Sequence, residues 1–201
     1  MKEKNKNSLY FNFYSGVSGD MLIGSLIDLG VDLNVLKNIL TKIDKGLSFE
    51  VKKVTRGINI CSLISPKFPK NLNKNFDWIE LKKFGYLIKE EKFVYHNFNE
   101  TIELLKKAEE NVHGEIDVKP HELGNFDTVF DIVCFYKCLE HLNIENLYHS
   151  GLPFSQGEIK IDHGAVSSLA PVTLNLIKSL GVPVYTSKKN PNFEMCTPTG
   201  V

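Results

Sequence analysis

The pattern of hydrophobic and polar positions along the chain predicts strands interleaved with helices. Short apolar runs typical of strands occupy 9–14, 49–54, 58–64, 147–153 and 182–185. The runs at 49–54 and 58–64 predict a hairpin. Helical periodicity covers 20–29, 33–43, 78–89, 99–112, 126–141 and 167–180. Together these elements predict an α/β or α+β fold, a layered mixed sheet with flanking helices in which an N-terminal strand-turn-helix precedes the hairpin.

One segment shows neither the helical nor the strand pattern of apolar residues. Residues 65–77 contain two prolines, three asparagines and three lysines and predict a loop that is looser than its surroundings. Neither an internal repeat nor a linker divides the sequence, so we expect a single region spanning 1–201.

Composition narrows the classes of partner. The 24 basic and 24 acidic side chains cancel, and Arg56 is the only arginine, which argues against binding to nucleic acid or to an anionic membrane. No signal sequence or membrane-spanning run is evident, and the four cysteines lack a CxxC pair, so we expect a cytoplasmic protein with reduced thiols. The oligomeric state is open, with a homo-oligomer among the alternatives.

The turn between the first strand and the first helix is a candidate binding site. Ser15, Gly16, Ser18 and Gly19 offer backbone N–H groups at a helix start, where an anion such as a phosphate can bind. Asp20 would repel a bare phosphate, but its carboxylate could hold a divalent cation that binds the phosphate in turn. The alternative is an ordinary helix cap at Ser18 or Asp20.

A second cluster gathers ionisable side chains within nineteen residues: His113, His121, Glu122, Asp127 and Asp131. Since Asp127 and Asp131 are four residues apart on a helix, both carboxylates project from one face, and His121 precedes the same end. Imidazole with carboxylate suits Mn, Ni, Zn or Fe, whereas carboxylates alone favour Mg or Mn. In the alternative, Asp127 only complements the helix dipole and Asp131 lies on the solvated face.

Other polar side chains have weaker patterns. Cys134 and Cys138 continue the same helix and are either soft nickel ligands or, as we favour, small buried core residues. His163 lies in a predicted loop, where it acts as a general acid/base or is simply a surface histidine.

Several segments, in this order and spacing, resemble the LarC family of nickel-insertion proteins over nearly the whole chain. They are Ser-Gly-Val-Ser-Gly-Asp-Met at 15–21, Ala-Glu-Glu-Asn-Val-His-Gly at 108–114, His-Glu-Leu-Gly at 121–124 with Asp127 and Asp131-Ile-Val, His163-Gly164, Ala170-Pro171, and the terminal Thr-Pro-Thr-Gly at 197–200.

The resemblance implies a nickel chelatase (cyclometallase) of the lyase class. Such proteins insert Ni(II) into pyridinium-3,5-bisthiocarboxylic acid mononucleotide, with Mn(II) and CTP, to form the nickel-pincer cofactor of lactate racemase-type enzymes. It also implies that Asp20, His121, Glu122, Asp127, Asp131 and His163 approach one cleft that handles metal or the phosphorylated pyridinium precursor, which is the expected partner. The individual roles are our inference: we expect Asp20 and His163 to be catalytic and His121, Glu122, Asp127 and Asp131 to be metal ligands.

The sequence also departs from the family pattern. Asn12 replaces the usual aspartate after the first strand, and Lys119 replaces the first histidine of a His-x-His motif. The C-terminal part that holds the cytidine nucleotide in the family has no counterpart here, so we expect a front half whose C-terminal half is a separate partner. The alternatives are a degenerate, non-catalytic relative and a metal-dependent phosphohydrolase-like enzyme.

Overall fold

A computed structural model describes residues 7–121, 123–154, 158–161, 164–167, 169–185 and 196–201. Its helices are α1 (Gly19–Asp28), α2 (Leu33–Ile43), α3 (Trp78–Leu87), α4 (Lys92–His113), α5 (Phe126–His141) and α6 (Pro171–Leu180), with a 3-10 turn at Lys70–Leu72. The strands are β1 (Asn7–Phe11), β2 (Ser48–Arg56), β3 (Asn59–Lys67), β4 (Ile144–His149), β5 (Leu152–Pro153), β6 (Glu158–Ile161), β7 (Gly164–Ser167) and β8 (Val184–Tyr185).

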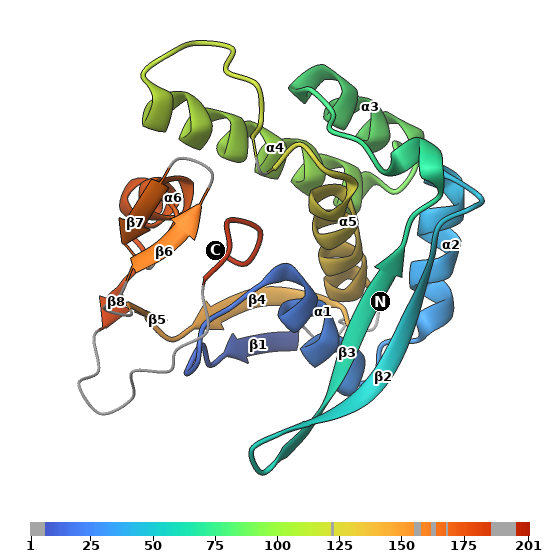
Figure 1. The fold of residues 1–201 in the computed structure, drawn as a ribbon. Coiled ribbons are helices and arrows are strands. Elements are labelled where there is room, and N and C mark those ends of the chain that lie inside the picture. The colour runs from blue at the N-terminus through green and yellow to red at the C-terminus, as the bar shows by residue number, and fades with distance from the viewer. Residues whose placement is uncertain (1–6, 122, 155–157, 162–163, 168, 186–195) are drawn as a thin grey trace.

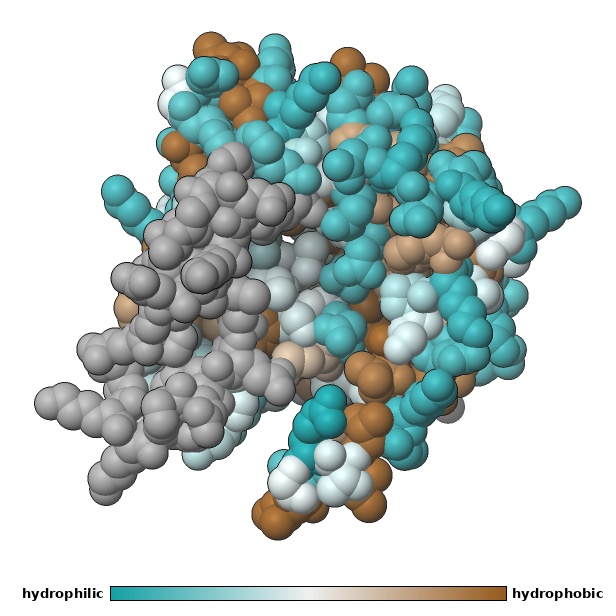
Figure 2. Space-filling model, in the orientation of Figure 1, coloured by the Kyte–Doolittle hydropathy of each residue, from teal (hydrophilic) through white to brown (hydrophobic). Residues whose placement is uncertain are grey.

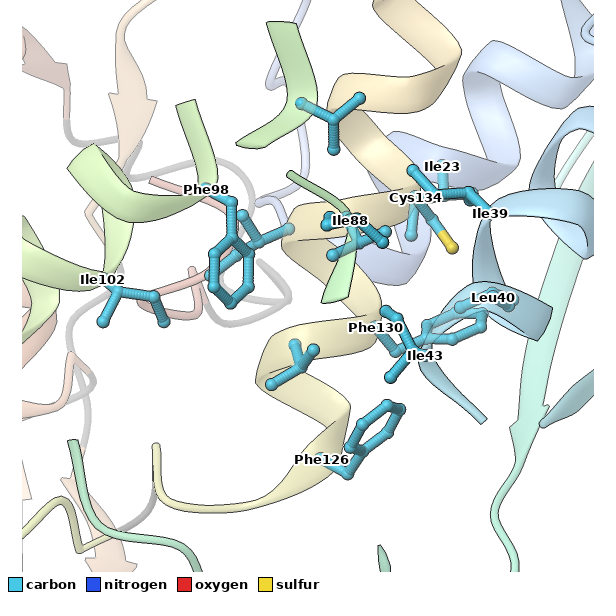
Figure 3. Close-up of a cluster of buried hydrophobic side chains, with 14 of the residues drawn as sticks. Ile23, Ile39, Leu40, Ile43, Ile88, Phe98, Ile102, Phe126, Phe130 and Cys134 are labelled. Atoms are coloured by element: carbon cyan, nitrogen blue, oxygen red, sulfur yellow. The ribbon is translucent and has the colours of Figure 1, made fainter. Parts of the chain in front are cut away.

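Helix α5 stands at the centre of the molecule, in contact with α1, α2 and α4 (Figure 1). Phe126 and Phe130 of this helix point into the main core, where α2 contributes Ile39 and Leu40 (Figure 3). Cys134 and Cys138 are fully buried in that core. Burial raises the pKa of the Cys138 thiol to about 12, so the preferred interpretation of these cysteines as core residues is confirmed and thiolate ligation is not favoured.

The described strands form four two-stranded sheets, so the predicted mixture of strands and helices is confirmed. Two pairs are parallel, β1 with β4 and β5 with β8, and two are antiparallel hairpins, β2 with β3 and β6 with β7. The apolar run at 9–14 forms a strand only as far as Phe11, and this strand is only partly buried. Alternate side chains of β1 point to opposite faces, so Leu9 and Phe11 pack against the core whereas Tyr10, between them, is 61% exposed.

Most predicted elements are confirmed, and the differences lie at their ends. Helices α2 and α5 have the predicted bounds, and Gly30 ends α1 with a φ of 103° that favours glycine. Strand β3 continues through Pro66 into the segment expected to be a loop, and α4 begins seven residues earlier than predicted, at Lys92 rather than 99.

Three predictions in the C-terminal third need correction. The run at 147–153 is split into β4 and β5, and the last helix begins at Pro171 rather than 167 because Ser167 ends β7. The hairpin β6–β7 adds two strands to a stretch in which the sequence predicts none.

The tip of the β2–β3 hairpin carries apolar surface, visible at the lower end of the molecule in Figure 2. Ile58 in this tip is 98% exposed. Within the described residues, no helix combines the length and apolar character needed to cross a membrane.

Candidate metal centre

The turn between β1 and α1 presents a carboxylate at the start of the helix. Ser18 occupies the N-cap position, but its hydroxyl donates to the carboxylate of Asp20 instead of bonding a backbone group of the helix. Gly19 approaches α5 so closely that a Cβ at this position would lie 2.1 Å from Oδ2 of Asp131. A glycine is therefore required where the first turn of α1 meets α5.

The first two turns of α5 direct two carboxylates to the same place. The Asn125 side chain accepts a hydrogen bond from the Thr128 backbone N–H at 3.1 Å and so caps the helix. Asp127 does not serve as the cap, and it lines a cavity together with Asp131 and Asp20. The alternative interpretation placed Asp131 on the solvated face of the helix. Asp131 is instead only 7% exposed, so that part of the alternative is wrong.

The segment 197–201 closes this acidic cavity. The Thr197 backbone N–H donates to the Val17 carbonyl at 2.9 Å, which fastens the segment to the turn before α1. The Thr199 hydroxyl donates to Oδ2 of Asp131 at 3.0 Å. The resulting cavity has a volume of about 370 Å³ and is lined by oxygen-bearing side chains from three parts of the sequence.

The electrostatics of the acidic cavity disfavour three bare carboxylates. Burial, followed by the neighbouring Asp20, raises the pKa of Asp127. Burial raises the pKa of Asp131 to about 8, with the Asp127 carboxylate adding to the effect and the Thr199 hydrogen bond opposing it. Across the described residues, no lysine, arginine or histidine forms an ion pair with Asp20, Asp127 or Asp131. A cation would supply the missing positive charge.

A second, more apolar cavity adjoins the acidic one. Its volume is about 280 Å³, and it shares Asp131 and Thr199 with the acidic cavity. Aromatic side chains line much of it, among them Phe11, Phe13 and Tyr148. An aromatic ring of a ligand would therefore find apolar surface beside the carboxylates.

His121 has neighbours other than these aspartates. Its ring lies 4.5 Å from the ring of His113, centroid to centroid, and its Nδ1 atom lies 3.7 Å from Oε2 of Glu109. It does not line the acidic cavity. The loop between α4 and α5 folds back along α4 (Figure 1), which brings His121 to the end of that helix.

The structure therefore brings together part of the predicted set. Asp20, Asp127, Asp131 and Ser18 share one cavity, and Gly19 packs directly against it. Ser15 and Gly16 lie in the preceding turn, where Gly16 has a φ of 112°. Glu122 and His163 lie outside the described residues.

Two residues that contact these sites were not predicted. Thr199 was seen only as part of a terminal motif, and nothing in its local sequence indicates a bond to a residue 68 positions away. Glu109 precedes His113 by four residues, a spacing that places both on one helix face. That spacing could have predicted the contact from the sequence, since it pairs an acidic residue with one of the clustered histidines.

The fold and these sites define a mixed α/β protein with one cavity lined by aspartates and a separate group of one glutamate and two histidines. Comparison with known proteins identifies its family. The model of the "Nickel insertion protein" family matches residues 9–201, so the chain belongs to that family and the resemblance seen in the sequence is confirmed.

Individual relatives agree with this assignment. The chain is 34% identical to a relative from Dictyoglomus thermophilum that is named for the same family, over 96% of this chain and 50% of the relative. It is 31% identical to each of two relatives named pyridinium-3,5-bisthiocarboxylic acid mononucleotide nickel insertion protein. The relative from Staphylococcus epidermidis aligns over 96% of this chain and 48% of its own length. The relative from Thermotoga petrophila aligns over 96% of this chain and 50% of its own length. The chain thus spans about half the length of the curated relatives it matches, and no solved structure matches it.

Proposed function

We propose that this chain takes part in the insertion of Ni(II) into pyridinium-3,5-bisthiocarboxylic acid mononucleotide, forming the nickel-pincer cofactor of lactate racemase-type enzymes. Family membership and the names of the relatives support the reaction. The observation that carries the assignment to this region is the meeting of Asp20, Asp127 and Asp131 in one cavity.

The donor set of the acidic cavity fits a hard divalent cation. Carboxylate and hydroxyl oxygens are the ligands that Mg²⁺ and Mn²⁺ prefer. Bound there, the ion would offset the mutual repulsion of the aspartates and favour the charged forms of Asp127 and Asp131, opposing the raised pKa values. We therefore assign Mn(II) to this cavity and place the CTP site in a region beyond the half that aligns with this chain.

The precursor carries a phosphate and a cationic aromatic ring. The aspartates would repel the phosphate directly, so a cation held by Asp20, Asp127 and Asp131 would supply the positive charge that attracts it. We propose that the ring binds in the adjoining apolar cavity, where Phe11, Phe13 and Tyr148 would offer aromatic surface to a cation.

The chemical step forms a nickel–carbon bond on the ring and releases the proton that this carbon carried. A carboxylate beside the ring is a suitable acceptor for that proton. We assign this role to Asp20, which lines the acidic cavity next to the one that would hold the ring, and a second acid/base role to His163. We keep Glu122 as a metal ligand on the resemblance alone.

The partners and compartment follow from the same proposal. We infer that a C-terminal half, corresponding to the part of the relatives that does not align with this chain, completes the activity. We also infer a cytoplasmic location, because the four cysteines are free thiols, as expected in a reducing compartment.

Calorimetric titration with Mn(II) tests the cavity. In an Asp127→Asn, Asp131→Asn double variant we expect Mn(II) affinity to fall at least about tenfold, since two charged ligands are lost. A Glu100→Gln, Glu103→Gln variant removes two carboxylates from α4 outside the cavity and should bind like the wild type. Equal Mn(II) affinity in all three proteins would reject the assignment.

A maturation assay tests the reaction. The chain is combined with the C-terminal half of a relative, Ni(II), Mn(II), CTP and the precursor, and activation of lactate racemase is measured. We expect activation by the wild type and little by the double aspartate variant. Mn(II)-dependent phosphate release from simple esters without activation would instead support the phosphohydrolase-like alternative.

A further inference from the structure

Glu109, His113 and His121 form a compact group of metal-ligating side chains outside the acidic cavity. Oε2 of Glu109 lies 3.4 Å from Nε2 of His113 and 3.7 Å from Nδ1 of His121, and one ligand atom from each residue lies within 4.8 Å of the others. Glu109 is only 2% exposed, whereas both histidines reach solvent. The group thus consists of a buried carboxylate and two imidazoles that lie between it and the solvent.

The backbone holds these three residues in place. Glu109 and His113 are one helical turn apart at the end of α4, and Gly114 ends that helix with a φ of 69°. The loop that returns His121 is anchored by two further contacts. The indole Nε1 of Trp78 donates to the Val118 carbonyl at 2.6 Å, and the Asp117 backbone N–H donates to Glu110 at 3.0 Å. Little reorganisation is therefore needed to bring the ligands together.

We propose that Glu109, His113 and His121 bind a divalent transition-metal ion. Metal–ligand bonds of about 2.0–2.2 Å place neighbouring ligand atoms roughly 3.0–3.5 Å apart. The 3.4 Å and 3.7 Å separations in this group are already close to that range. Two imidazoles and one carboxylate leave coordination positions open, as in sites that exchange a ligand or pass on a metal.

The ligand types separate this site from the acidic cavity. Nitrogen donors favour Ni²⁺ over Mn²⁺ by the usual order of divalent metals, whereas the all-oxygen cavity suits Mn²⁺ or Mg²⁺. The loop that carries His121 continues to Leu123 and Asn125, which line the acidic cavity. We accordingly identify the ion as Ni(II) awaiting insertion. This identity rests on the proposed function, whereas the existence of the site does not.

Titration of the full chain with Ni(II), and separately with Mn(II), tests the site by calorimetry at neutral pH. We expect Ni(II) to bind more tightly than Mn(II) and the His113→Asn and His121→Asn variants each to lose at least about tenfold in Ni(II) affinity, because each removes a ligand. Co(II) serves as a spectroscopic probe, and its visible absorption bands should change in both variants. Both histidines reach solvent, so circular dichroism and the melting temperature should match the wild type.

A matched control lies on the same helix. His96 and Glu100 of α4 are also four residues apart with a 3.4 Å separation, but they are exposed, and no third metal-ligating residue joins them in the described part of the chain. The His96→Asn variant should therefore bind Ni(II) like the wild type. Unchanged Ni(II) affinity in His113→Asn and His121→Asn, or equal losses in all three variants, would overturn the proposal.

The double aspartate variant distinguishes the Ni(II) site proposed here from the Mn(II) site proposed in the acidic cavity. We expect Asp127→Asn, Asp131→Asn to keep its Ni(II) affinity while losing Mn(II) affinity. Loss of Ni(II) binding in that variant together with unchanged binding in the histidine variants would place nickel in the acidic cavity and refute the separate site.

Discussion

At the scale of single residues, Gly19 and Asp131 depend on each other. Asp131 is buried beside other acidic groups, an arrangement that burial and charge repulsion both disfavour. It fits only because Gly19 has no side chain where α1 meets α5. Such a costly carboxylate is easier to understand as a ligand than as a contribution to stability.

Substitution of Gly19 by alanine tests this close approach. A Cβ would lie 2.1 Å from Oδ2 and 2.7 Å from Cβ of Asp131, and we expect the clash to lower the free energy of unfolding by about 1–3 kcal/mol. Urea denaturation measures the change. In an Asp131→Ala background the loss should be smaller, because the two nearest atoms, Oδ2 and Cγ, are absent and only the contact with Cβ remains. An identical loss in both backgrounds would show that the contact with the carboxyl group is not its cause.

At the scale of elements, a small ion-pair network joins three helices around the start of α4. The Glu91 carboxylate, at the N-cap position, accepts a hydrogen bond from Lys137 of α5 at 2.7 Å and another from Lys42 of α2. These bonds, first that from Lys137 and then that from Lys42, lower the pKa of Glu91 below its usual 4.5. The network therefore stabilises the packing of α2 and α5 at this end of α4.

The lowered pKa predicts a pH-dependent contribution to stability. A carboxyl group with a lower pKa in the folded state stabilises the fold fully above its unfolded value and loses that contribution as the pH falls through the folded value. Glu91→Gln should thus cost about 0.5–1 kcal/mol near neutral pH, a modest amount because the network is partly exposed, and progressively less below pH 4.5. Urea denaturation at several pH values measures this, and a cost that does not vary with pH would contradict the ion-pair explanation.

At the scale of the whole molecule, segments far apart in the sequence meet around the acidic cavity. Besides the bond between Thr197 and Val17, Gly200 lies so close to the same turn that a Cβ would be 2.6 Å from the Val17 carbonyl oxygen. The cavity therefore depends on how segment 197–201 docks against the turn before α1.

Gly200→Ala should disturb this docking without changing a ligand. We expect Mn(II) affinity to fall roughly tenfold, equivalent to about 1.4 kcal/mol, because Thr199 moves away from Asp131. Ni(II) affinity at Glu109, His113 and His121 should stay unchanged and serves as an internal control in the same calorimetric experiment. A parallel fall in both affinities would indicate general destabilisation instead.

The sequence by itself determined the helices, the β2–β3 hairpin and the family. Periodicity predicts α2 and α5 at their observed bounds because burial against a core demands a regular spacing of apolar residues. The spacing of Asp127 and Asp131 likewise predicts carboxylates that meet at one site, since both lie on a single helix face.

Only the tertiary structure decided which side chains share a site. His121 and Asp127 are six residues apart in the sequence, yet the loop before α5 directs His121 to Glu109 and His113, whereas Asp127 faces Asp20. Thr199 reaches Asp131 for the same reason: docking of the 197–201 segment depends on long-range contacts that local spacing does not encode. Local periodicity specifies a helix and its faces, but which distant segment covers a face follows from the packing of the whole chain.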